Sequence, residues 1–91
     1  MSAGLKFIGL PENHYIATRE YARSITDDPY LYSIVKHAAH MANMLRYVAG
    51  WTPIHDQVNK RVQRATTTAI RMGYSLKEVN NAHDAGMQYK G

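Results

Sequence analysis

The residues best suited to bind a ligand lie in the second half of the chain, where basic side chains follow one another without an acidic neighbour. The segment from Gln57 to Lys77 contains no Asp or Glu. Arginine and hydroxyl side chains bind the oxygen atoms of phosphate groups. We therefore predict a site for a nucleic acid or another phosphate-bearing ligand, although a solvated helix face would give the same pattern. The predicted phosphate-binding residues are Lys60, Arg61, Arg64, Thr68, Arg71 and Lys77.

Two adjacent asparagines follow this basic segment. Asn can bind the edge of adenine through a pair of hydrogen bonds, and Lys can bind the acceptor atoms of guanine. Asn is a weak helix former, so Asn80 and Asn81 lower the stability of the helix in which they are expected to lie. That loss is explained if both side chains contact a ligand. We therefore predict that Lys77, Asn80 and Asn81 contact base edges.

The junction between these two segments has the signals of a sharp turn between helices. Gly73 can adopt the left-handed backbone conformation found just past a helix end. Ser75 and Glu78 have the spacing of a capping box, which starts a new helix. Ala69, Gly73 and Val79 follow the small–x3–Gly–x5–Val spacing that helix-turn-helix motifs of DNA-binding proteins share. Residues 52–87 are therefore a candidate helix-turn-helix, with an ordinary corner of a helical bundle as the alternative.

Further start and stop signals indicate an all-α fold. Asp28–Pro29 and Thr52–Pro53 each combine a capping side chain with proline at the first helical position, and Gly50 follows an apolar stripe. We predict a single domain over residues 1–91, a small bundle of about four helices near 11–25, 29–49, 53–72 and 75–87. The two long middle helices should be antiparallel, and residues 1–10 should form an N-terminal extension.

The segment 29–49 carries two partly apolar faces. A wide apolar stripe is accompanied by a second row that is semi-polar and aromatic, which comprises Tyr30, His37, His40, Met44 and Tyr47. Such a helix lies at the centre of a domain or forms part of an oligomer interface. The central position is favoured, because large apolar faces are usually core. The second face also predicts a homo-oligomer, most simply a dimer.

Tyrosines are unusually frequent in this short chain, which has seven of them and one tryptophan. Tyrosine rings bury a large area at interfaces and can stack on bases. Tyr15, Tyr21 and Tyr74 are therefore candidate ligand-stacking residues. The alternative is that these rings cover a small core.

Composition narrows the class of protein. The net charge is +4 and no cysteine is present. A basic balance favours polyanionic partners, and the lack of cysteine fits a reducing compartment. We find no segment that could span a bilayer, no signal peptide, no glycine-rich phosphate loop and no nucleophile elbow. The sequence predicts a cytoplasmic protein without a cofactor and without a membrane partner.

The histidines suggest a different chemistry. His37 and His40 are spaced so that both could face one way on a helix and bind a metal ion. His55–Asp56 and His83–Asp84 are two further histidine–aspartate pairs. This combination on a helical scaffold resembles the HD-type metal phosphohydrolases, which implies metal-dependent hydrolysis. Helix capping explains His55 and Asp56 equally well, because a carboxylate suits a helix N-terminus. We therefore expect no metal site and no enzymatic activity.

These observations predict a small, basic, non-enzymatic binding protein, with helix-turn-helix nucleic-acid binding and a regulatory role as the first hypothesis. The alternative is a compact helical module that captures a host protein or a nucleotide ligand through its basic, tyrosine-rich surface. In size and style such a module is similar to small inhibitors and sequestering proteins of phages and mobile elements. A metal-dependent hydrolase is the third hypothesis.

Overall fold

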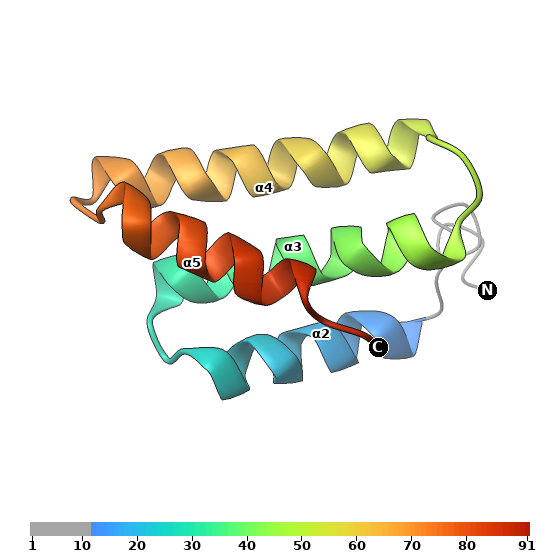
Figure 1. The fold of residues 1–91 in the computed structure, drawn as a ribbon, viewed down its shortest axis with the longest axis horizontal. Helices are drawn as coiled ribbons and strands as arrows, with labels where there is room; N and C mark the ends of the chain where they lie inside the picture. Colours follow the sequence, from blue (N-terminus) through green and yellow to red (C-terminus); the bar gives the residue numbers. More distant parts are fainter. Residues whose placement is uncertain (1–11) are drawn as a thin grey trace.

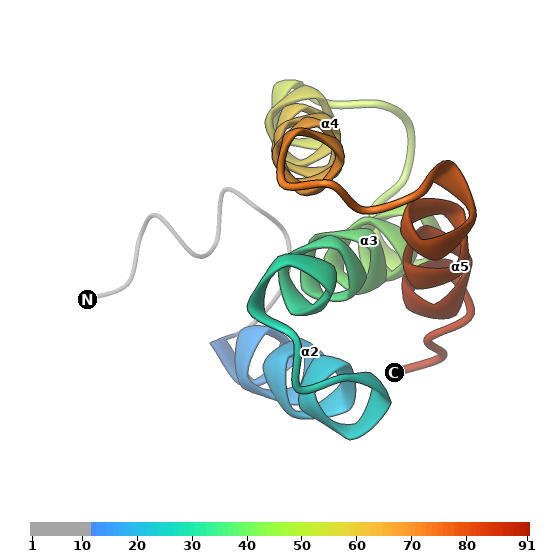
Figure 2. The same ribbon diagram turned by 90° about the vertical axis from the view of Figure 1, so that its left-hand side faces the viewer.

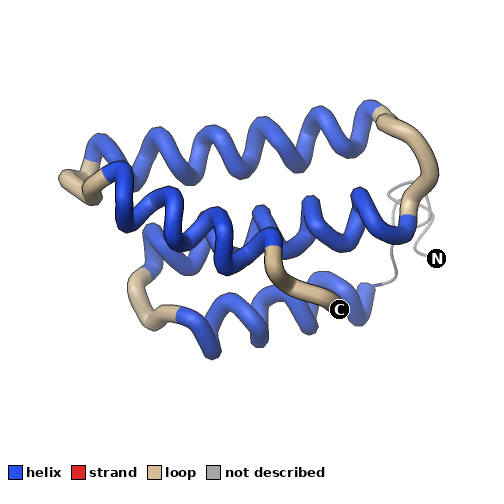
Figure 3. Tube along the Cα trace, viewed as in Figure 1, coloured by secondary structure: helices blue, strands red, loops and turns tan. Residues whose placement is uncertain are grey.

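The computed structural model describes residues 12–91, which fold into α-helices without a strand in that range (Figure 1, Figure 3). The helices are α2 (Glu12–Ile25), α3 (Pro29–Tyr47), α4 (Pro53–Arg71) and α5 (Leu76–Met87). The predicted all-α fold is confirmed, and the ends of α3, α4 and α5 fall within a few residues of the predicted ones. The predicted extension over residues 1–10 lies outside the described residues.

Each of the last three helices starts at the predicted cap. The Asp28 carboxylate accepts hydrogen bonds from the backbone N–H groups of Tyr30 and Leu31, at 2.9 and 3.0 Å. Ser75 and Glu78 form the predicted capping box, with reciprocal hydrogen bonds of 3.1 and 3.0 Å. At α4 the box is closed by histidine, because His55 Nδ1 accepts from the Thr52 backbone N–H at 3.0 Å. These bonds satisfy amide groups that a helix start otherwise leaves free.

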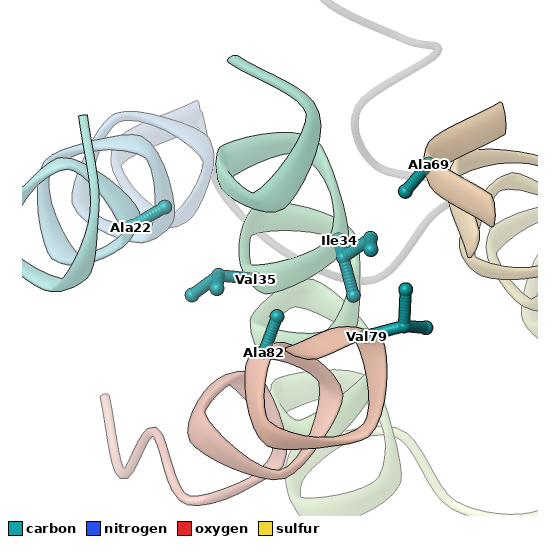
Figure 4. Packing of buried hydrophobic residues seen from close by; sticks show 6 residues of the cluster. All are labelled: Ala22, Ile34, Val35, Ala69, Val79 and Ala82. Carbon is teal, nitrogen blue, oxygen red and sulfur yellow. The ribbon is translucent and has the colours of Figure 1, made fainter. Parts of the chain in front are cut away.

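The four helices run alternately up and down along the 40 Å long axis of the molecule, and α3 lies at the centre (Figure 1, Figure 2). Helices α2, α4 and α5 each pack against α3, whereas α4 and α5 contact each other little. Helices α3 and α4 are antiparallel, as predicted. The core joins Ile34 and Val35 of α3 to small and branched residues of the other three helices, which are Ala22, Ala69, Val79 and Ala82 (Figure 4).

The second face of α3 is covered within the chain. His40 and Met44 are buried, and Tyr30 and His37 are half-buried. Tyr47 is the one member of this row that is mainly exposed. Because three helices surround α3, the fold gives no support for the dimer that we predicted through this face.

The turn between α4 and α5 is as sharp as predicted, with Gly73 at a φ of 99°. The two helices then run in opposite directions along the long axis (Figure 1, Figure 2). Helices α4 and α5 contact each other little, because both pack mainly on α3. That residues 52–87 form a helix-turn-helix stays a prediction.

Helix α5 lies very close to α3 at Gly86, a residue that the sequence patterns did not single out. A Cβ atom at this position would lie 2.5 Å from the Cβ atom of Ala38 and 2.7 Å from the backbone oxygen of Val35. Since a backbone atom cannot move aside alone, α5 would have to shift away from α3. Glycine is thus what permits the contact between these two helices.

We expect Gly86→Ala to lower the free energy of unfolding by about 1–3 kcal/mol, as overpacked cores do. The sign of this change in stability distinguishes crowding from helix propensity, because alanine in an unhindered helix interior would raise stability by about 1 kcal/mol over glycine. Urea denaturation measures the change, and Asp84→Ala on the exposed side of α5 is the control. A Gly86→Ala protein as stable as wild type would contradict this account of the α3–α5 contact.

None of the helices within residues 12–91 is both long enough and apolar enough to cross a bilayer.

A basic cleft between α3 and α4

A cleft of about 620 Å³ opens between the N-terminal half of α3 and the C-terminal half of α4. Helix α4 supplies Arg61, Arg64 and Thr68, whose spacing places them on one helical face. Helix α3 supplies Tyr30, Ser33 and His37 at the same spacing. The remaining lining residues are Pro29 and Ala65. Antiparallel packing of α3 and α4 brings the two rows together. Each wall of the cleft therefore consists of side chains from successive turns of one helix.

The chemistry of the lining suits an anion. Two guanidinium groups and the hydroxyl groups of Tyr30, Ser33 and Thr68 offer hydrogen-bond donors, and no carboxylate of the described residues lines the cleft. Asp28, next to Pro29, is bound to the amides of the α3 start and accepts a further hydrogen bond from the Tyr74 hydroxyl. That Tyr74 hydrogen bond, followed by the one from the Leu31 amide, lowers the pKa of Asp28. The Asp28 carboxylate is thus hydrogen-bonded to other groups of the protein.

Lys36 of α3 lies close enough to two other cations to feel their charge. Burial lowers the pKa of Lys36, and the charges of Arg19 and Arg61 lower it further. Over residues 13–91, no carboxylate oxygen lies within 4.0 Å of these cations or of Arg64, and the ion pair found there joins His83 to Asp84. This group of cations therefore lacks a counter-charge from the described part of the protein.

His37 does not add to this charge at neutral pH. Burial lowers the pKa of His37 to about 4, and the charges of Lys36, Arg61 and His40 act in the same direction. The neutral imidazole offers one N–H donor and one acceptor nitrogen. The positive charge of the cleft wall at neutral pH therefore comes from its two arginines.

The structure brings together some of the predicted phosphate-binding residues and separates others. Arg61, Arg64 and Thr68 share the cleft, whereas Lys60 and Arg71 are exposed on α4 outside its lining. The residues Tyr30 and Ser33 were not predicted to be part of this site. Their spacing to His37 could have suggested a common face, but only the packing of α3 on α4 shows which residues oppose it.

The predicted base-contacting residues lie elsewhere. Asn80 lines a groove of about 530 Å³ between α4 and α5, whose other polar residues are Asn59, Gln63, Thr66, Thr67 and His83. Asn81 lines a separate hollow of about 280 Å³ beside Ile25 and Glu78. Lys77 is exposed. The predicted phosphate-binding residues Arg61 and Arg64 and the predicted base-contacting residues Asn80 and Asn81 thus line different hollows.

The three candidate stacking tyrosines each contact other parts of the fold. Tyr15 stacks on the ring of His40 with a centroid distance of 4.6 Å. The Tyr21 hydroxyl donates to the backbone oxygen of Ala85 at 2.7 Å. The Tyr74 hydroxyl donates to Asp28, and this hydrogen bond raises the pKa of Tyr74 to about 12. Their role in ligand stacking stays a prediction.

The histidines are spread over the fold. His55 closes the cap of α4, and His83 lies on α5 at 4.0 Å from the Asp84 carboxylate. In the part of the chain that the structure describes, no group of three or more His, Cys, Asp or Glu side chains lies close enough to hold a metal ion. His37 and His40 therefore have no third ligand among these residues.

No protein-family model, no curated protein and no solved structure matches this chain.

Proposed function

We propose that this chain is a non-enzymatic nucleic-acid-binding protein that holds a backbone phosphate in the cleft between α3 and α4. The observation that supports this function is the pair Arg61 and Arg64, which lines the cleft without a carboxylate partner in the described residues. Charge-assisted hydrogen bonds from arginine to phosphate are short, directional and often bidentate. The hydroxyl groups of Ser33 and Thr68 can complete such a site from opposite walls.

The electrostatics of the neighbouring residues favour an anion at this place. Like charges close together repel one another, and Lys36 lies near both Arg19 and Arg61. A bound phosphate would replace part of that repulsion by attraction. The attraction between the phosphate and each of these cations is what favours binding.

A nucleotide ligand is the second candidate, and the size of the cleft favours it. Clefts that bind small molecules measure roughly 300–1,000 Å³, and this one measures about 620 Å³. The ring of Tyr30 at its edge could contact a base while Arg61 and Arg64 hold the phosphate. Both candidates use the same phosphate chemistry and differ in whether binding extends beyond one nucleotide.

Fluorescence anisotropy with a labelled oligonucleotide tests the proposal. We expect binding that weakens roughly 30-fold between 50 and 200 mM salt, with a slope of about −2 to −3 for three or four phosphate contacts. Competition with unlabelled nucleoside triphosphate separates the two candidates, since only a nucleotide site would be blocked at stoichiometric concentration. Absence of binding to any oligonucleotide at low salt would contradict nucleic-acid binding.

A further inference from the structure

The cations near the cleft continue across the molecule onto α3 and α2. The Lys36 Nζ atom lies 5.4 Å from the ring centroid of Tyr32, and the Arg23 Cζ atom lies 5.6 Å from the same centroid. One aromatic ring thus has a cation from α2 and a cation from α3 against it. The charge of Arg61 in the cleft also acts on Lys36, so cations of α2, α3 and α4 face one side of the bundle near Tyr32 and the cleft. We name Arg19, Arg23, Lys36, Arg61 and Arg64 the transverse band.

Glu20 of α2 points away from Arg19 of this band. Arg19 and Arg23 are one helical turn apart and share a face, whereas Glu20 projects about 100° around the helix from Arg19. Burial, and then the nearby Tyr47 and Glu20, raise the pKa of Tyr89 in the C-terminal segment. Glu20 is therefore close to the C-terminal segment, and it forms no ion pair within 4.0 Å with Arg23 among the described residues.

The shape and make-up of the band suit a flexible strand better than a duplex. Two of its arginines line a recess, which a flexible single strand can follow by bending more easily than a stiff duplex with a persistence length of about 150 base pairs. Proteins that hold single strands combine a basic track with aromatic rings, on which bases stack. Tyr30 lines the recess, and Tyr32 lies within the band between Arg23 and Lys36.

We propose that the nucleic acid bound by this chain is single-stranded and that its backbone follows the transverse band across α4, α3 and α2, with one phosphate in the cleft. This inference rests on the proposed function and adds the form of the nucleic acid and its path. It predicts that a strand long enough to cross three helices binds more tightly than one that fills only the cleft.

The test measures the affinity of the full chain for single strands of about 2, 4, 8 and 12 nucleotides and for a duplex of the same length as the longest strand. The variants are Arg23→Gln with Lys36→Gln and, because Lys36 is half-buried, Arg23→Gln alone. Lys60→Gln with Lys77→Gln removes the same charge outside the band. Thermal melting followed by circular dichroism checks that each variant is folded.

We expect affinity to rise with strand length and the single strand to bind more tightly than the duplex. The double band variant should lower the salt slope for the longest strand by about 1.4, which is about 0.7 for each phosphate that the protein no longer binds, and Arg23→Gln alone should lower it by about 0.7. Arg23→Gln alone should leave binding of the shortest strand unchanged, and the outside variant should change the long-strand slope less. Tighter duplex binding, or equal effects of band and outside variants, would overturn the inference while the proposed function stands. If no oligonucleotide binds, the proposed function fails as well.

Discussion

Reversing the charge of both cleft arginines, Arg61→Glu with Arg64→Glu, should weaken oligonucleotide binding at least about 100-fold. A hydrogen bond to a charged group contributes about 1.5–3 kcal/mol, and the double variant removes two. The new carboxylates would also repel the phosphate. Both arginines are exposed and have no carboxylate partner in the described residues, so the fold should keep its stability within about 0.5 kcal/mol.

The matched control changes the same helix by the same charge. Lys60→Glu with Arg71→Glu alters two exposed residues of α4 that do not line the cleft. We expect this control to weaken binding only through the general electrostatic field, by roughly 10-fold or less at 150 mM salt, where charges beyond about 8 Å are largely screened. Equal losses of affinity for the two double variants would show that α4 attracts anions as a whole and that the cleft has no special role.

The second large effect is a loss of stability at acidic pH. Burial, followed by the charges of Arg61 and His14, lowers the pKa of His40 to about 4, and the pKa of His37 is lowered to about 4 as well. The unfolded chain protonates both near pH 6.5, so between pH 6.5 and 4 it binds more protons than the folded protein does. The free energy of unfolding therefore falls as pH falls through this window. His40, with 5% of its surface exposed, should account for about 3 kcal/mol by pH 4. The half-buried His37 should add less.

Urea denaturation at several pH values checks this effect. His40→Phe keeps an aromatic ring against Tyr15 but cannot be protonated. Its free energy of unfolding should change less with pH than that of wild type between pH 6.5 and 4. Asp28 contributes little to the change in this pH range, because its pKa is lowered from the ordinary value of 3.8 and its carboxylate is protonated only at lower pH. A wild type and a His40→Phe variant with parallel pH profiles would show that His40 is not responsible.

Most of the architecture could be predicted because its signals are local. The caps at Asp28, Thr52 and Ser75 and the glycine at position 73 act within one helical turn, so sequence spacing is sufficient to locate them. The common face of Arg61, Arg64 and Thr68 also follows from helical periodicity. These features required no knowledge of how one helix packs on another.

The rest depends on packing between distant segments. Tyr30 and Ser33 belong to the cleft only because α3 turns this face toward α4. Gly86 is essential because α5 crosses α3 at that residue, and nothing in its neighbours along the chain marks this contact. Asn80 and Asn81 are adjacent in sequence but line different hollows, because successive helical residues point about 100° apart. The other helices cover most of the second face of α3, which the sequence alone could not show, and the dimer stays a prediction.

The most direct test of the cleft is to locate a bound oligonucleotide by NMR, from the backbone amide shifts of isotope-labelled protein titrated with a short single strand. If the cleft holds the phosphate, the largest shifts should occur at Ser33, His37, Arg61, Arg64 and Thr68, and they should saturate together. Shifts centred on Lys77, Asn80 and Asn81, with the cleft residues unchanged, would contradict the account and place the nucleic acid on α5.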